Sequence, residues 1–198
     1  MLTQIRKEQF GKPRLVPPVF NLGFLTIVGQ EYVAMIHRLG KFNRVMEAGV
    51  HWKIPFIESI DAVHDMREWV IEIEPQVGTT KDNVQISSDA YLYMQIVDPV
   101  KASYNVEDNV QAIVELAQST MRSQIGKISM DQTFMKRASI NEAIKKEIGE
   151  VVREWGCEII RFELKDINPP ANIEKAMILQ AEAERNKRAQ ILSSEGER

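Results

Sequence analysis

The stretch from Cys157 to Arg198 constrains the fold most, because it joins two different periodicities across a double proline. Apolar and charged residues alternate through residues 160–165, which is the pattern of a strand with one buried face. Pro169-Pro170 end this pattern, since proline has no amide hydrogen for a sheet and restricts the residue before it. Strong helix formers then run without Gly or Pro as far as Glu195, so the sequence predicts one long charged terminal helix. The strand side chains predicted to be buried are Ile160, Phe162 and Leu164.

The predicted terminal helix is charge-paired and has few large apolar residues in its middle. Acidic residues precede basic ones at helix spacing there, and each such pair stabilises a helix by about 0.2–0.5 kcal/mol. A lone helix supported only in this way is marginal in water. Two interpretations stay open: a solvated terminal helix, or lateral packing against copies of itself or close relatives. In the second, the oligomerisation residues are Glu182, Glu184, Arg185, Lys187 and Arg188.

Composition and charge fit one globular domain with an appendage. The chain is 44% hydrophobic and 27% charged, and its net charge of −3 gives no reason to expect a nucleic-acid partner. A single cysteine, Cys157, excludes an intrachain disulfide, and we interpret it as a small buried hydrophobe rather than a reactive thiol. The three histidines are scattered without metal-ligand spacing, so no metal or cofactor is predicted.

The first 28 residues have a basic part and then an apolar part. The basic part, residues 1–14, is similar to a mitochondrial targeting segment, and a basic tail near anionic lipid headgroups is an equal alternative. Residues 15–28 are apolar but interrupted by Pro17-Pro18, Asn21 and Gly23, so they do not read as a spanning helix. They either rest in the membrane interface or pack on protein as an extended lead-in. The interfacial residues in the first case are Val19, Phe20, Leu22 and Phe24.

A second apolar cluster lies between Gly49 and Ile57. Its indole and lysine stem suit the edge of a bilayer, where a side chain can sit half in water. A strand that packs these groups inward is the alternative. The membrane-contact residues predicted here are Trp52, Phe56 and Ile57.

The middle of the chain predicts an α+β domain. Residues 69–77 and 84–96 alternate cleanly around a polar turn, which favours an antiparallel hairpin. Two amphipathic helices follow, one capped by Asn105 and the other opened by a capping box over residues 139–142. We therefore expect a mainly antiparallel sheet covered by helices. The expected segments are a lead-in over 1–23, the domain over 24–169 and the start of a coiled-coil-like helix over 170–198.

Catalytic motifs are absent from the sequence. It contains no nucleophile elbow, P-loop, dinucleotide fingerprint or zinc-protease motif. His64 beside Asp65 could act as a general base, but no neighbouring residue in the sequence reads as a nucleophile or metal ligand. We therefore predict a structural protein rather than an enzyme, and keep a hydrolase that uses His64 and Asp65 as the competing hypothesis.

Five strings in order carry a family resemblance. They are RLGKF…EAGVHWKIPFIESI, TTKDNVQISSDAYLYMQIVDPVKASYNVED, QSTMRSQIGKISMDQ, REWGCEIIRFELKDINPP and AEAERNKRAQILSSEGER. Together they resemble the SPFH (band-7, stomatin/prohibitin) family over residues 24–198. The interrupted apolar lead-in is similar to the paraslipin branch, which lacks the longer membrane-buried segment of stomatin.

The resemblance implies a membrane-associated scaffold. Family members rest a small α+β domain on a membrane and assemble, with themselves or with related SPFH chains, into rings or cages. Such assemblies are taken to hold inner-membrane proteases and respiratory complexes in place. The paraslipin branch implies the mitochondrial inner membrane and affinity for cardiolipin, with the inner face of the plasma membrane as the alternative. If the chain ends at Arg198, we expect it to lack the cage wall, which favours a fixed accessory subunit of a respiratory complex as the alternative function.

Overall fold

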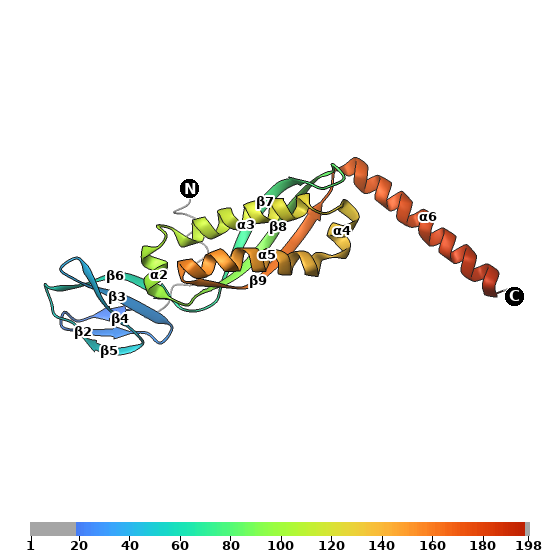
Figure 1. Ribbon diagram of the computed structural model, residues 1–198. Helices are drawn as coiled ribbons and strands as arrows, with labels where there is room; N and C mark the ends of the chain where they lie inside the picture. Colours follow the sequence, from blue (N-terminus) through green and yellow to red (C-terminus); the bar gives the residue numbers. More distant parts are fainter. Residues whose placement is uncertain (1–18, 197–198) are drawn as a thin grey trace. The chain divides into compact units, whose positions relative to one another are not determined.

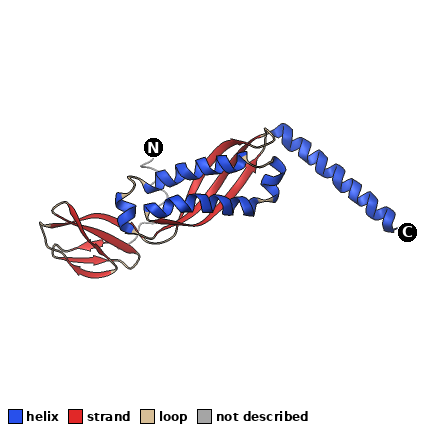
Figure 2. Cartoon of the chain, viewed as in Figure 1, coloured by secondary structure: helices blue, strands red, loops and turns tan. Residues whose placement is uncertain are grey.

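The computed structural model describes residues 19–196 (Figures 1 and 2). The chain forms two compact units, and it passes from the first to the second twice. Unit 1 consists of the described part of Met1–Arg67 together with Ile96–Asn105. Unit 2 consists of Glu68–Gln95 together with the described part of Val106–Arg198.

Unit 1 contains two three-stranded sheets and one short helix. The strand orders are β1-β2-β5 and β4-β3-β6, and all of these pairings are antiparallel. The first described strand begins at Val19, inside the segment 1–23 that the sequence assigned to the lead-in. The elements are β1 (Val19–Asn21), β2 (Leu25–Val28), β3 (Tyr32–Arg38), β4 (Lys41–Met46), β5 (Gly49–Trp52), β6 (Glu58–Asp65) and α2 (Pro99–Tyr104).

The core of unit 1 joins its two sheets. Val28 from β2 packs with Ala34, Ile36 and Met46 from β3 and β4, and all four side chains are buried. Val19 from β1 is partly buried against the same cluster. One face of sheet β1-β2-β5 is therefore covered by the other sheet.

Unit 2 is built on a third sheet, whose order is β7-β8-β9. β7 (Trp69–Thr79) and β8 (Gln85–Ile96) pair antiparallel, which confirms the predicted hairpin. Strand β9 (Cys157–Asn168) also runs antiparallel to β8, because contacts that advance along β9 step backward along β8. Its Arg161 lies over Tyr93, whereas its Lys165 lies over Tyr91.

The predicted alternation within β9 is wrong at one position. Ile160 is exposed rather than buried, and its neighbour Ile159 takes the core position. Ile160 and Arg161 are both exposed, so the inward face shifts by one residue before Phe162. A one-residue shift of this kind moves the whole pattern to the opposite face of a strand.

Two helices cover one face of the unit 2 sheet, as Figures 1 and 2 show. α3 packs on β7 and α5 packs on β9, and the two helices also contact each other. Their buried stripes include Ile113 and Met121 on α3, and Ile144 and Ile148 on α5. The predicted α+β class is thus confirmed. The helices of unit 2 are α3 (Asn109–Gly126), α4 (Met130–Met135), α5 (Arg137–Val152), the 3₁₀ helix η1 (Arg153–Trp155) and α6 (Ala171–Gly196).

Both predicted helix starts are wrong. Asn105 ends the short helix α2 instead of opening α3, and α3 is capped by Asp108, which accepts a hydrogen bond from Gln111 N–H at 3.2 Å. The expected capping box at residues 139–142 lies inside α5, which already begins at Arg137. There Ile140 N–H donates to the carbonyl of Lys136 at 3.0 Å, which is an ordinary intrahelical bond, so the backbone before Ser139 is already helical.

Loss of the α3 cap should destabilise unit 2. We expect Asp108→Ala to lower the free energy of unfolding by about 1 kcal/mol, because Gln111 N–H loses its acceptor. Ser129→Ala is the matched control, since Ser129 occupies the cap position of α4 without a side-chain hydrogen bond. Urea unfolding of both variants measures the difference. Equal stabilities would contradict the assignment of Asp108 as the cap.

Candidate functional site

One region of unit 1 exposes many large apolar side chains. Single exposed apolar residues are ordinary on protein surfaces, but a contiguous group marks a contact surface. We call this group the apolar surface, and it has a sheet part and a loop part. The sheet part is Phe20, Leu22, Phe24, Ile27, Val50 and Trp52, and the loop part is Leu39, Ile54, Phe56 and Ile57.

The sheet part lies across the outer face of β1-β2-β5. Phe20 stands opposite Ile27, and Ile27 stands opposite Val50, so these three exposed side chains form a row across the strands. Trp52 follows Val50 on the same face, because side chains two residues apart in a strand point the same way. The Trp52 ring stacks on Phe24 with 5.6 Å between the ring centroids. The outer face of this sheet is therefore apolar, whereas the inner face carries the buried Thr26 as well as Val28.

The loop part has an unusual backbone. Leu39 and Phe56 both adopt positive φ angles, 52° and 66° respectively. A left-handed conformation costs a residue other than glycine about 1–2 kcal/mol. Leu39 and Gly40 form the tight turn between β3 and β4, where Asn or Gly usually takes the first place. Phe56 is fully exposed, at 104% of its reference area, and such strained positions often mark function.

Hydrogen bonds join the two loops and the sheet part. Leu39 N–H donates to the carbonyl of Ile57 at 3.0 Å, which ties the β3–β4 turn to the loop that carries Phe56. Lys53 N–H donates to the carbonyl of Phe24 at 2.8 Å, which ties that loop to the start of β2. The apolar surface is therefore one connected structure.

A buried carboxylate lies behind the loop part. The Glu58 side chain has no exposed area and accepts hydrogen bonds from Ile54 N–H at 3.0 Å, Arg38 Nη2 at 2.8 Å and Asn43 Nδ2 at 3.2 Å. Arg44 Nη2 lies 3.4 Å from its second oxygen. The bond from Ile54 N–H, followed by that from Arg38, holds the pKa of Glu58 below its usual value despite burial. The carboxylate is therefore charged, and it is the kind of paired ion that an interior tolerates.

Several basic residues lie at or beside the loop part of the apolar surface. Arg38 and Arg44 share the single Glu58 carboxylate, so this cluster keeps one net positive charge. Both guanidinium side chains stay close to half exposed. Lys41 and Lys53 stand beside the two loops. An apolar surface with a basic border suits a layer with an apolar interior and an anionic edge.

The predicted membrane-contact residues fall mostly on this surface. Six of them are exposed, namely Phe20, Leu22, Phe24, Trp52, Phe56 and Ile57, whereas Val19 is partly buried against the core. Their contact with a membrane stays a prediction. Sequence reasoning missed Leu39, Ile27 and Val50. The one available signal for Leu39 was a leucine directly before the turn glycine, Gly40.

The predicted oligomerisation residues lie on α6. Glu182, Arg185, Lys187 and Arg188 are exposed, while the side chain of Glu184 lies outside the described residues. Lateral packing through these residues stays a prediction.

The hypothetical catalytic pair has different partners in the structure. His64 Nε2 lies 2.6 Å from Ser103 Oγ in α2, and burial lowers the pKa of the imidazole. Asp65 is held by Arg67, whose Nε donates to it at 2.9 Å. The two side chains project to opposite faces of β6, because adjacent residues of a strand do so.

Cys157 is buried, and burial raises its thiol pKa to about 11, which confirms its interpretation as an inert core residue.

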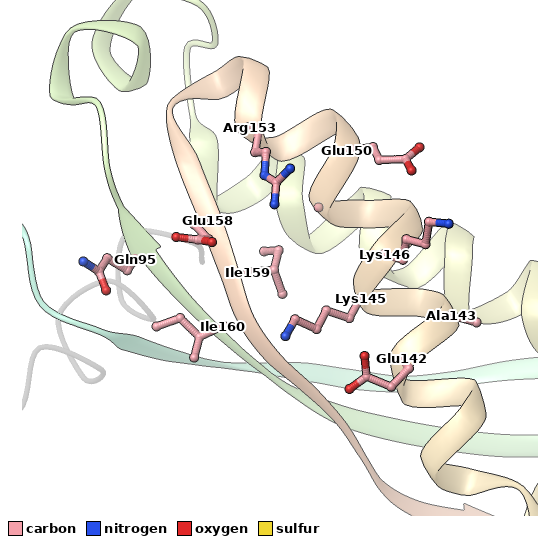
Figure 3. Close-up of a pocket in the computed structure, with 11 residues that line it drawn as sticks. Gln95, Glu142, Ala143, Lys145, Lys146, Glu150, Arg153, Glu158, Ile159 and Ile160 are labelled. Atoms are coloured by element: carbon pink, nitrogen blue, oxygen red, sulfur yellow. The ribbon is translucent and has the colours of Figure 1, made fainter.

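A groove in unit 2 lies between α5 and β9 (Figure 3). Lys145, Lys146 and Arg153 line it together with Glu142 and Glu150. Glu142, Lys146 and Glu150 follow one another at four-residue spacing, which is the pattern of a solvated helix flank. The groove therefore has no concentration of one charge that would select a ligand.

Two features are absent from the part of residues 19–196 that the structure describes. No helix in that range is both long and apolar enough to cross a membrane. No three His, Cys, Asp or Glu side chains that the structure describes gather into a metal-binding group.

The chain is similar to known proteins over most of its length. The model of the SPFH domain / Band 7 family matches residues 26–198. Stomatin-like protein 2, mitochondrial, of Homo sapiens is 40% identical over 193 residues, which cover 98% of this chain and 52% of that protein. Stomatin-like protein stl-1 of Caenorhabditis elegans is 43% identical over 172 residues, or 87% of this chain and 53% of that protein. The chain thus spans about half the length of these relatives.

An archaeal relative is matched over most of its length. An uncharacterized protein of Methanocaldococcus jannaschii is 39% identical over 174 residues, which cover 88% of this chain and 87% of that protein. The resemblance inferred from the five sequence strings is confirmed by these matches.

Replacing the exposed ring of Phe56 should leave the fold intact. We expect Phe56→Asn to lower the free energy of unfolding by no more than about 0.5 kcal/mol, because the ring is solvent-exposed and Asn tolerates positive φ. Phe162→Ala, which removes a buried ring, should lower it by about 3–5 kcal/mol. Thermal and urea unfolding compare the two variants. Similar losses in both would show that Phe56 is packed in solution.

Proposed function

The chain belongs to the SPFH domain / Band 7 family, and from that premise we propose that it is a non-enzymatic scaffold on a membrane surface. It docks through the apolar surface of unit 1 and assembles with other SPFH-family chains, identical or related, through α6. In this way it organises the proteins and lipids of that membrane.

The observation that carries the proposal is the exposed and strained apolar surface. Immersing a ring such as Phe56 or Trp52 contributes about 1.5–3 kcal/mol. Each nearby Lys or Arg adds about 1 kcal/mol at an anionic surface. The stacked Trp52 indole suits the headgroup level, where its apolar body and polar N–H are both accommodated. Several such groups on one surface are enough for peripheral binding without a spanning helix.

The names of the relatives supply the proposed location. Stomatin-like protein 2 is described as mitochondrial, which supports the mitochondrial inner membrane for this chain, with the inner face of the plasma membrane as the alternative. Cardiolipin is the proposed anionic lipid, because two adjacent phosphates match a surface that carries several basic groups. Inner-membrane proteases and respiratory complexes are the proposed protein partners.

Charge placed on the apolar surface should weaken membrane binding. We expect the wild-type chain to float with vesicles that contain anionic lipid, and Phe56→Asp or Phe20→Asp to bind about tenfold more weakly, because a charge replaces an exposed ring that would enter the membrane. Met135→Asp is the control, since Met135 is also an exposed apolar residue but lies on α4 of unit 2. Flotation of both variants at the wild-type level would show that these rings face protein instead.

Charge reversal on α6 should disrupt assembly. We expect the wild-type chain to form oligomers at micromolar concentration in detergent. The double variant Arg185→Glu with Arg188→Glu should dissociate, because each reversal turns an attractive charge pair into a repulsive one. Lys145→Glu on α5 is the control for a charge change alone. Size-exclusion chromatography with light scattering measures the mass. A wild-type monomer would contradict self-assembly, and co-purification at fixed stoichiometry with one respiratory complex would favour the accessory-subunit alternative.

A further inference from the structure

We propose that Glu58 is the positioning residue of the apolar surface. Its buried carboxylate holds the Leu39 turn and the loop from Ile54 to Ile57 in the one conformation that presents Phe56 and Ile57 outward. This inference rests on the proposed membrane docking of unit 1. It holds that Glu58 orders the apolar surface before that surface contacts a membrane.

The contacts of Glu58 converge from three segments. Its second oxygen accepts from Ile54 N–H at 3.0 Å, and its own N–H donates back to the Ile54 carbonyl at 2.9 Å, so the loop is closed at both ends. Its first oxygen accepts from Arg38 at the end of β3 at 2.8 Å and from Asn43 in β4 at 3.2 Å. The loop, β3 and β4 therefore share one buried charge.

The backbone needs such an anchor. Leu39 and Phe56 occupy left-handed conformations that other residues avoid, and both side chains stand in solvent. Contacts of the exposed Phe56 ring within the unit cannot hold its backbone in place. Strain of this kind persists only where surrounding bonds over-determine it. The charge-assisted hydrogen bonds of Glu58 are the strongest bonds at the base of this loop.

The same carboxylate also reaches the sheet part. Arg44 lies against Glu58 and donates to the carbonyl of Trp52, at the end of β5. Because Trp52 stacks on Phe24, the orientation of the Arg44 guanidinium also affects the position of this aromatic pair. One buried group thus connects both parts of the apolar surface.

Strand β6 contains its own control for this inference. Glu58 is the first residue of β6 and Asp65 is the last, and both are buried carboxylates held by arginine. Asp65 accepts from Arg67, away from the apolar loops. Glu58→Gln and Asp65→Asn remove the same charge from the same strand. Both raise the net charge equally, so simple attraction to an anionic surface would strengthen in both variants.

The test compares these two variants in the full chain. Vesicles of phosphatidylcholine with phosphatidylglycerol measure binding, and trypsin cleavage after Lys53 measures release of the loop without any membrane. We expect Glu58→Gln to bind about tenfold more weakly and to be cut faster at the Lys53–Ile54 bond, because an uncharged amide holds the donors less strongly. Asp65→Asn should bind within about twofold of wild type, and its cleavage at Lys53 should not change.

A second variant keeps the test decisive if Glu58→Gln does not fold. Arg44→Lys keeps the charge but loses the Nη2 donor that contacts both Glu58 and the Trp52 carbonyl, so we expect roughly threefold weaker binding. Wild-type binding by both Glu58→Gln and Arg44→Lys would overturn the inference. Equal losses in Glu58→Gln and Asp65→Asn would also overturn it, because they would indicate a general effect on folding. A wild-type chain that does not bind overturns the proposed docking, and cleavage at Lys53 then decides by itself whether Glu58 holds the loop.

Discussion

Unit 1 depends on a small antiparallel sheet that packs on the second sheet with one face and exposes apolar side chains on the other. The inner face, with Val28 and the partly buried Val19, packs on the second sheet and forms the core. The outer face presents Phe20, Ile27 and Val50 to solvent. A sheet in contact with water on one side usually places polar residues there. The outer face therefore departs from what folding alone would select, and an external apolar surface is the simplest reason for it.

The sheet of unit 2 also has a face that no helix covers, but its aromatic side chains are covered in another way. Its helices cover one face, and the other face places Arg161 over Tyr93 and Lys165 over Tyr91. Lys165 also lies 3.2 Å from both Glu72 and Asp89, and these bonds raise the pKa of its ammonium. The aromatic rings are thus covered by long polar side chains of the same unit. In unit 2 the aromatic face of the sheet is therefore already covered, whereas the outer face of β1-β2-β5 in unit 1 is bare.

Sequence patterns predicted the elements better than their ends. The hairpin over residues 69–96 and the buried stripes of α3 and α5 followed from strict periodicity and long runs. The cap of α3 was misplaced because Asn105 and Asp108 are both good cap residues, and the short helix α2 was not foreseen. Ile160 was misassigned because one irregular residue reverses the faces of a strand.

The candidate site was less predictable than the fold. Alternation shows that Trp52 and its neighbours share a face, but it does not show whether that face meets the core or the outside. The positive φ of Leu39 leaves no trace in hydrophobic periodicity, since a leucine in a turn looks like the end of a strand. Glu58 was equally hidden, because a single acid at a strand start reads as a surface residue until its four donors are seen together.

In the proposed scaffold, docking and assembly strengthen each other. The apolar surface of one chain is small, so its membrane attachment is reversible on its own. Once several chains are held together, each further docking event is intramolecular, and the effective concentration of membrane sites rises steeply. The converse also holds, because confinement to a surface raises the local concentration of α6 helices that are only marginally stable alone. A pre-ordered docking loop matters most in this situation, since every chain in the assembly avoids the entropy cost of ordering it at contact.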